Sequence, residues 1–228
     1  MTEYRRYGVY YTPPAGAFAD FGGSWLGWDA EKGVAAVQPT IEGLDLPQLT
    51  QEPRKYGFHA TLKAPFRLAQ GIMLPDLTKA FGKLASELPA VVLPRLQLAK
   101  LGSFFALVPK ENIILLQSLA DKLVTGLDHL RAPLTAAEVA RRKPERLSAR
   151  QRDYLDRWGY PYVFDEFRFH MTLSGPLDLS VSDRFEQALK RRLAVVPDPL
   201  VIDSICLMGE GEDGRFYLIE RAGLKGSR

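Results

Sequence analysis

Short runs of alternating apolar and polar residues predict strands at several places along this chain of 228 residues. In the stretch 58–62, Phe58, Ala60 and Leu62 alternate with His59 and Thr61. Successive side chains of a strand point to opposite faces, so the apolar residues form a core face and the histidine and threonine share the other face. Further strands are predicted over 4–11, in a pair across 91–108, over 166–173, over 200–210 and over 214–222.

Apolar residues spaced three and four apart predict helices between these strands. In the segment 75–88, Leu77, Phe81, Leu84 and Leu88 fall on one helical stripe. The same spacing predicts helices over 111–131 and 181–193, and two shorter ones within 132–160. A mixture of this kind favours an α+β fold with mostly antiparallel sheets over a parallel doubly wound sheet.

Three details of these elements follow from capping and turn residues. Ser148 and Gly159 are suited to begin and end the second of the two shorter helices. Ser182 is expected to cap the helix over 181–193. The segment 38–53 is rich in proline and is expected to be a loop.

The chain contains an internal repeat. The stretch "FHATLKAP" at 58–65 aligns without gaps to "FHMTLSGP" at 169–176, and five of the eight positions are identical. Each copy precedes a predicted helix and then a strand pair. We therefore expect residues 1–228 to form a single bilobal domain, in which two pseudo-symmetric lobes face a central cleft and carry their helices outside.

The repeated polar residues are His59 and Thr61 in one copy and His170 and Thr172 in the other. Two histidines that meet across a cleft suit in-line displacement at a phosphodiester, since one can remove a proton while the other protonates the leaving oxygen. An ordinary histidine pKa near 6.5 allows both protonation states near neutral pH. The threonine hydroxyls can hydrogen-bond the phosphoryl oxygens. The spacing leaves open which histidine is the base.

Strand parity suggests further substrate-binding residues. Lys63 is expected on the His59 face and Arg168 on the His170 face, where each could hold phosphate charge or simply lie in solvent. Tyr56 belongs to a group of tyrosines near the strand starts, some of which could stack on a base or ribose, while most fit the core or its rim. His129 is expected to be a helix-end residue without a catalytic role.

Composition narrows the class of protein. Hydrophobic residues make up 46% of the chain and charged residues 25%, as in soluble globular proteins. The first residues lack the apolar core of a signal peptide and no run is long enough to span a bilayer, so we expect a cytoplasmic protein without membrane contact. One cysteine and three histidines provide few ligands for a zinc site, and we expect neither metal nor cofactor.

The motifs His59-Ala60-Thr61 and His170-Met171-Thr172 resemble those of the two-histidine (2H) phosphoesterase superfamily. A closer similarity, to a branch found with bacterial phosphonate-degradation genes, rests on "RYGVYYTPP", "KYGFHATLKAPF", "LRAPLTAAEVARRKPERLSARQRDYLDRWGYPYVFDEFRFHMTL" and the hydrophobic strand pair between them. The resemblance implies a bilobal 2H phosphoesterase-like fold and a metal-independent phosphodiesterase. A small cyclic phosphodiester, such as a ribosyl cyclic phosphate, is the substrate class that it implies, and we expect a monomer.

Two other functions remain open at this point. RNA-end processing, as in 2′-5′ RNA ligase-like enzymes, would need a basic groove beside the histidines. The basic residues cluster instead at 141–152 and 190–192, on helices expected to lie away from the motifs, so RNA is the less favoured substrate. A non-catalytic module that binds a nucleotide or phosphate in the same cleft is the other alternative.

Overall fold

The computed structural model describes residues 4–226. Its centre is an antiparallel seven-stranded sheet with the order β11-β10-β1-β4-β8-β7-β6. The strands are β1 (Tyr7–Tyr11), β4 (Ala60–Phe66), β6 (Gln97–Leu101), β7 (Phe104–Val108), β8 (Met171–Thr172), β10 (Ser204–Glu210) and β11 (Phe216–Gly223). The predicted α+β class with antiparallel sheets is confirmed.

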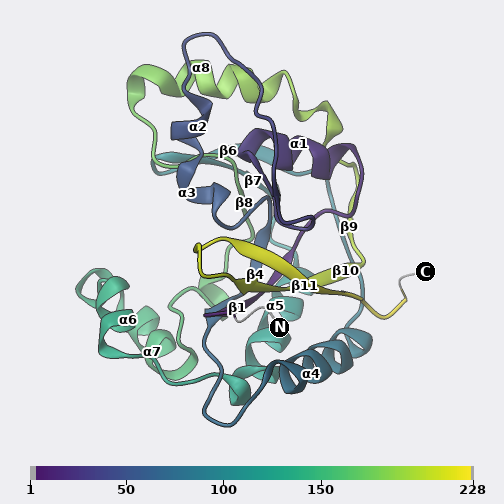
Figure 1. Ribbon diagram of the computed structural model, residues 1–228, viewed down its shortest axis with the longest axis vertical. Helices are drawn as coiled ribbons and strands as arrows, with labels where there is room; N and C mark the ends of the chain where they lie inside the picture. Colours follow the sequence, from purple (N-terminus) through teal and green to yellow (C-terminus); the bar gives the residue numbers. More distant parts are fainter. Residues whose placement is uncertain (1–3, 227–228) are drawn as a thin grey trace.

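Two smaller sheets accompany the central one. Strands β2 (Trp28–Asp29) and β3 (Val34–Ala35) form one, and β5 (Val91–Leu93) and β9 (Leu200–Ile202) form the other. The helices are α1 (Ala17–Leu26), α2 (Leu46–Leu49), α3 (Gln51–Arg54), α4 (Leu74–Glu87), α5 (Ile114–Gly126), α6 (Ala136–Arg141), α7 (Ala149–Trp158) and α8 (Leu179–Lys190). Figure 1 shows α1 and α8 towards the top of the view, α4 and α5 towards the bottom, and α6 and α7 projecting at the lower left as an arm.

The large core lies on one face of the sheet. Side chains from α1, α4, α5 and α8 pack there against the apolar positions of the strands, as Trp25, Phe81, Leu123 and Phe185 show. Burial of such side chains is the main source of stability, at roughly 25 cal/mol per Å² of apolar surface. The opposite face carries a smaller cluster that includes Tyr10 and Phe216. The catalytic candidates lie on this second face.

Several element predictions are confirmed with adjusted ends. The helix expected over 75–88 spans Leu74–Glu87 and buries Leu77 and Phe81. Ser148 caps α7 by accepting a hydrogen bond from the Gln151 backbone N–H, and α7 ends at Gly159. The strand expected over 166–173 is much shorter, since only Met171 and Thr172 join the sheet.

Two other predictions are wrong. The segment 38–53 contains the short helices α2 and α3, because Asp45 caps α2 and Pro47 occupies its first turn, where a proline is tolerated. Ser182 does not cap α8, which begins three residues earlier at Leu179. Its hydroxyl instead accepts a hydrogen bond from the Lys100 ammonium at 2.7 Å.

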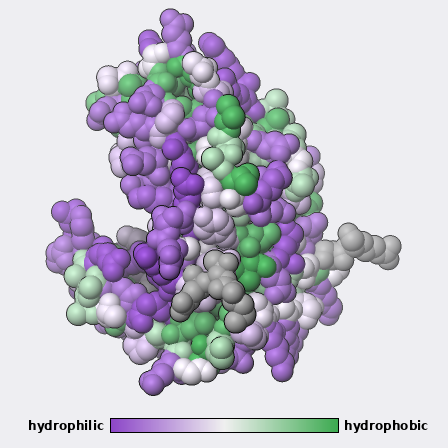
Figure 2. All heavy atoms as spheres, viewed as in Figure 1, coloured by the Kyte–Doolittle hydropathy of each residue, from purple (hydrophilic) through white to green (hydrophobic). Residues whose placement is uncertain are grey.

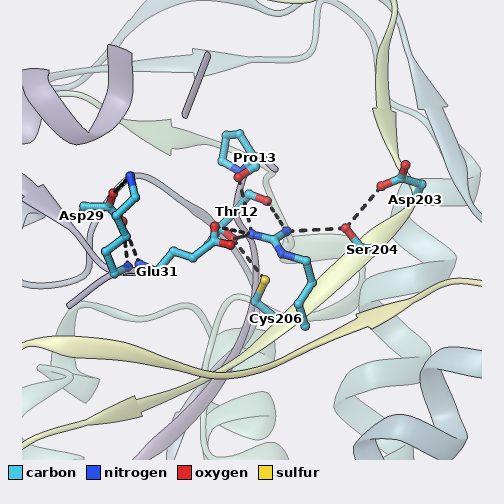
Figure 3. Close-up of polar contacts among 9 residues, drawn as sticks. Thr12, Pro13, Asp29, Glu31, Asp203, Ser204 and Cys206 are labelled. Atoms are coloured by element: carbon cyan, nitrogen blue, oxygen red, sulfur yellow. Dashed lines mark hydrogen bonds and ion pairs between the residues drawn. The ribbon is translucent and has the colours of Figure 1, made fainter. Parts of the chain in front are cut away.

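Polar contacts fix the end of β1 against β10 and β11. The Arg221 guanidinium donates to the backbone oxygen and the hydroxyl of Thr12 and to the Glu31 carboxylate. Thr12, Glu31, Ser204 and Cys206 converge at this point in Figure 3. Cys206 is a buried free cysteine, and its sulfur lies 3.0 Å from the Thr12 hydroxyl.

Figure 2 shows that hydrophilic residues predominate over the α6–α7 arm and the surface beside it. Among residues 4–226 there is no helix with the length and apolar character needed to cross a membrane.

Candidate active site

The two His-x-Thr motifs lie side by side in the middle of the sheet. Strands β4 and β8 are antiparallel neighbours, with Ala60 opposite Met171. Continuing that register by one residue in each direction sets His59 opposite Thr172 and Thr61 opposite His170. Side chains directly opposite each other in such a pair stand about 4.5–5.5 Å apart at Cβ. The four polar side chains therefore share one face, while Ala60 and Met171 are buried on the other.

His59 is held by hydrogen bonds on both ring nitrogens. Its Nδ1 lies 2.9 Å from the carbonyl oxygen of Gly57, and its Nε2 lies 3.1 Å from the Thr61 hydroxyl. A carbonyl oxygen can only accept, so Nδ1 carries the hydrogen and Nε2 is the free base. Burial lowers the pKa of His59 to about 4, and the neighbouring His170 adds to this lowering. His59 is therefore neutral at neutral pH.

His170 repeats the same arrangement. Its Nδ1 lies 2.8 Å from the carbonyl oxygen of Arg168, again two residues earlier in the chain. The hydrogen on Nδ1 leaves Nε2 to face the cleft, either as a base or, when protonated, as a donor. The two imidazoles are thus presented by equivalent backbone contacts, which the sequence repeat reflects.

All four motif residues line one cleft with a volume of about 400 Å³. This volume is in the range that protein pockets use for small ligands. The other lining residues are Arg6, Tyr10, Tyr56, Ala64, Pro65, Leu134, Glu138, Arg141, Arg142 and Tyr160. The cleft is therefore bounded by the sheet on one side and by the α6 segment and Tyr160, just after α7, on the other.

The charges in this cleft favour an anion. Glu138 is already paired with Arg67, whose guanidinium donates two hydrogen bonds of 3.0 Å to its carboxylate. Arg6 is similarly paired with Glu210. Within residues 4–226, Arg141 and Arg142 form no ion pair. Two guanidinium groups are thus available to a ligand.

The position of these arginines corrects an expectation. The basic cluster at 141–152 was expected to lie away from the motifs, but its first two members line the same cleft as the histidines. The capping box of Thr135 and Glu138 starts α6, and the Glu138–Arg67 pair ties it to the residue after β4. This tertiary contact brings the arm to the cleft, and no local pattern in the sequence reveals it.

Tyr10 is a second lining residue that the sequence did not single out. It lies opposite Thr61 on the neighbouring strand, and its ring centroid is 4.1 Å from that of His59. Gly8 leaves room for it, since a Cβ there would lie 2.9 Å from the Tyr10 ring. Among the described residues, the Tyr10 hydroxyl is the one buried side-chain polar atom without a hydrogen-bond partner. Burial raises the pKa of Tyr10 well above its usual value, so the phenol stays a donor.

Lys63 does not reach the cleft, contrary to the parity prediction. The register between β1 and β4 shifts between the pairs Tyr10–Thr61 and Val9–Lys63, which marks a β-bulge. The extra residue turns Lys63 to the buried side, next to Leu62. Its ammonium donates to the Val124 carbonyl at 3.0 Å, and burial lowers the pKa of Lys63 to about 8. It anchors α5 to the sheet.

Arg168 is also outside the cleft. Its guanidinium donates to the carbonyl oxygens of Asp165 and Phe167 and lines a separate groove beside them. The regular strand begins only at Met171, so the alternation does not govern Arg168. Tyr56 does line the cleft, with its ring centroid 5.8 Å from that of His59.

Among residues 4–226 no group of three or more histidine, cysteine or carboxylate side chains is placed to hold a metal ion. The donors in the cleft are two imidazoles and a carboxylate already paired with Arg67.

Comparison with known proteins assigns the family. The chain belongs to the family described as "Protein of unknown function (DUF1045)", which it matches over residues 61–217. This range includes Thr61 and the whole of the second motif.

Two curated relatives share the name "Ribose 1,5-bisphosphate phosphokinase PhnN". The protein from Janthinobacterium sp. (strain Marseille) is 38% identical over 218 residues, which cover 92% of this chain and 48% of the relative. The protein from Laribacter hongkongensis (strain HLHK9) is 36% identical over 174 residues, which cover 76% of this chain and 40% of the relative. The chain thus spans less than half the length of these relatives.

Solved structures that match nearly the full chain include one described as a phosphoesterase, which is 14% identical, with 97% of this chain and 99% of that chain covered and a TM-score of 0.44. E. coli LigT complexed with 3′-AMP is 15% identical, with 98% of this chain and 99% of that chain covered and a TM-score of 0.45. TT0787 of Thermus thermophilus is 16% identical, with 98% and 100% covered and a TM-score of 0.47. All three scores are below 0.5, so the description of the fold rests on this chain's own sheet and helices.

Proposed function

We propose that this chain is a metal-independent phosphodiesterase of the two-histidine class that opens a small cyclic phosphodiester. The observation that carries the proposal is the placement of His59, Thr61, His170 and Thr172 on one face of adjacent strands, inside a cleft that also holds two unpaired arginines. The facing imidazoles supply proton transfer and the threonine hydroxyls stabilise charge on the phosphoryl oxygens, while the arginines favour an anionic substrate in the cleft. The two motifs make the chain one catalytic unit built from both halves of the sequence.

His59 is the base in this proposal, because its lowered pKa keeps it neutral and its Nε2 is unprotonated. It takes a proton from a water molecule whose oxygen attacks the phosphorus. The bond between phosphorus and one ring oxygen breaks, and His170 as imidazolium donates its Nε2 proton to that oxygen. The product is an open phosphomonoester with one free hydroxyl. Thr61 and Thr172 hydrogen-bond the non-bridging oxygens during this step.

A ribosyl cyclic phosphate is the substrate class that we propose. The curated relatives are named for a kinase of ribose 1,5-bisphosphate, although this chain spans less than half of them. A ribosyl cyclic phosphate opens to a ribose phosphate, which is chemically close to the sugar in that name. Tyr56 beside His59 offers an aromatic face to a sugar, and the buried Tyr10 hydroxyl, which has no partner among the described residues, offers it a donor.

The test uses purified protein and ribosyl and nucleoside cyclic phosphates, with and without a chelator. We expect turnover to survive the chelator and to fall by about 10²–10⁴-fold in His59→Ala and in His170→Ala. Arg157→Ala, a change at an exposed surface pair, is the control and should keep full activity. Turnover that requires added metal, or that survives both histidine changes, contradicts the proposal. Tight product binding without turnover identifies a phosphate-binding module instead.

RNA-end processing is the second candidate, and the position of Arg141 and Arg142 beside the histidines favours it. An oligonucleotide with a 2′,3′-cyclic phosphate end would extend beyond a cleft of about 400 Å³. Comparing kcat/KM for such an oligonucleotide with that for the mononucleotide separates the two functions. A preference for the oligonucleotide makes RNA the substrate.

A further inference from the structure

Arg141 and Arg142 lie across the cleft from the motif strands and are not needed for the chemistry at phosphorus. Arg141 is the last residue of α6 and Arg142 follows it directly. Both line the cleft that contains His59 and His170. Neither forms an ion pair within residues 4–226, whereas the cleft's other arginine, Arg6, is paired with Glu210.

We propose that Arg141 and Arg142 form a second anion subsite, which binds a phosphoryl group of the substrate that is not itself attacked. This inference rests on the proposed function for the identity of the reacting group, and it names the substrate class as a small cyclic phosphodiester that carries an additional phosphomonoester. Guanidinium groups suit this role, because their planar forks match phosphate oxygens bidentately.

The Arg142 side chain is held in place before any ligand binds. Its guanidinium carbon lies 4.8 Å from the centroid of the Tyr160 ring, in a cation–π contact. Tyr160 directly follows Gly159, which has a φ of 72° and ends α7 in the left-handed conformation. That turn directs the chain back to the cleft, where Tyr160 is itself a lining residue. A pre-placed guanidinium loses less side-chain entropy on binding.

Hydrogen bonds to Glu138 also hold the α6 helix in place. Glu138 accepts hydrogen bonds from the Thr135 backbone N–H and from Nε and Nη2 of Arg67, which follows β4 directly. The strand that carries Thr61 and the helix that carries Arg141 are therefore joined by one ion pair. The distance between the reaction centre and the arginines is set by this contact.

The cleft's volume supports a ligand larger than a single phosphate group. About 400 Å³ accommodates a phosphorylated sugar or nucleotide, with one phosphoryl group at the histidines and another at the arginines. Tyr10 also lines this cleft, and its buried hydroxyl, which has no partner among the described residues, can donate to the sugar.

A binding experiment tests the subsite without requiring turnover. Calorimetry compares adenosine 3′,5′-bisphosphate with adenosine 3′-monophosphate on the full chain. We expect the bisphosphate to bind at least about tenfold more tightly, and the double change Arg141→Ala/Arg142→Ala to remove that preference. Arg142→Lys should retain part of it. Arg146→Ala removes an exposed positive charge that does not line the cleft, and it should leave the preference unchanged.

Equal affinities for the two ligands in the wild type, or a preference that persists in the double variant, would overturn the subsite. Steady-state kinetics then shows whether the subsite alone is wrong or whether the proposed phosphodiesterase activity is wrong as well. On nucleoside 2′,3′-cyclic phosphates with and without a 5′-phosphate, the double variant should raise KM for the phosphorylated substrate alone. Turnover without any such discrimination removes the subsite and leaves the phosphodiesterase. An arginine-dependent binding preference without ring opening keeps the subsite and contradicts the proposed phosphodiesterase activity.

A further measurement with an oligonucleotide distinguishes the source of the second phosphate. If a cyclic-phosphate oligonucleotide without a 5′-phosphate shows the arginine-dependent gain and the 5′-phosphorylated mononucleotide does not, the subsite serves an RNA backbone and the proposal for a small substrate is wrong.

Discussion

At the scale of single residues, the backbone carbonyls before each histidine decide which ring nitrogen can act. Gly57 and Arg168 supply these carbonyls, each two residues ahead of its histidine. Both imidazoles therefore expose Nε2 to the cleft. Burial lowers the pKa of His59 to about 4, which suits this residue to the role of base proposed above.

This pKa predicts the acid side of the pH profile. The free enzyme should lose kcat/KM as pH falls through about 4, where His59 gains its proton, instead of near the ordinary histidine value of about 6.5. The sign follows from burial, which disfavours the charged imidazolium. Initial rates in a pH series at constant ionic strength measure this limb. An acid limb close to pH 6.5 would show that His59 is not the base in the free enzyme.

Tyr10 supplies a second prediction at this scale. Its buried hydroxyl has no partner among the described residues, and an unsatisfied buried donor of this kind costs about 1–3 kcal/mol. Tyr10→Phe should therefore keep or raise the free energy of unfolding, by about 1 kcal/mol, while KM for the cyclic substrate rises. Urea unfolding and steady-state kinetics give the two readouts. Lower stability together with an unchanged KM would assign Tyr10 to packing alone.

At the scale of elements, the arm of α6 and α7 completes a cleft whose floor is the sheet. The bidentate contact between Arg67 and Glu138 makes this attachment, and the Arg67 guanidinium lowers the pKa of Glu138 to about 2. The contribution of this pair to stability is present above pH 4.5 and is lost as pH falls from there through about 2.

Arg67→Ala should loosen the arm and leave the histidines in place. We expect a higher KM, a nearly unchanged kcat, and a small loss of stability of about 0.5 kcal/mol, since the Arg67 side chain is partly exposed. The loss of stability between pH 5 and pH 3, measured by urea unfolding, should be smaller in the variant than in the wild type. Arg157→Ala, which breaks an exposed pair within α7, is the matched control. A fall in kcat with KM unchanged would place Arg67 in the chemistry.

At the scale of the whole molecule, the site combines residues from distant parts of the chain. Tyr10 comes from β1, Thr61 from β4, Arg141 from α6 and Thr172 from β8. A ligand bound in this cleft binds the folded protein and not the unfolded chain, so it stabilises the fold.

Inorganic phosphate should therefore raise the melting temperature, with a stabilisation of about 2.7 kcal/mol at one hundred times its dissociation constant. The increase should be greatly reduced in the double variant His59→Ala/His170→Ala, whatever its own melting temperature. Scanning calorimetry at matched ionic strength, with chloride as the control anion, measures this shift. Equal shifts in both proteins would locate phosphate binding away from the histidines.

The sequence alone identified the α+β class, the repeat and the four motif residues. The motif residues were found from the alternation of apolar and polar residues, which gives the correct face of each side chain wherever a strand is regular. Phe58 and Ala60 are buried, while His59 and Thr61 face the cleft. The prediction for Lys63 failed because a bulge shifts the parity of β4 within its own length. Arg168 failed because the regular part of β8 begins after it.

The tertiary structure alone decided what surrounds the motifs. Cross-strand pairing set His59 next to the second motif, and the long-range pair of Arg67 and Glu138 brought Arg141 to the same cleft. The pKa of His59 depends on burial by residues far apart in the sequence. Periodicity indicates on which face of its own helix or strand a side chain lies. The residues that this face contacts depend on how the elements pack, and a single sequence carries no local signal of that packing.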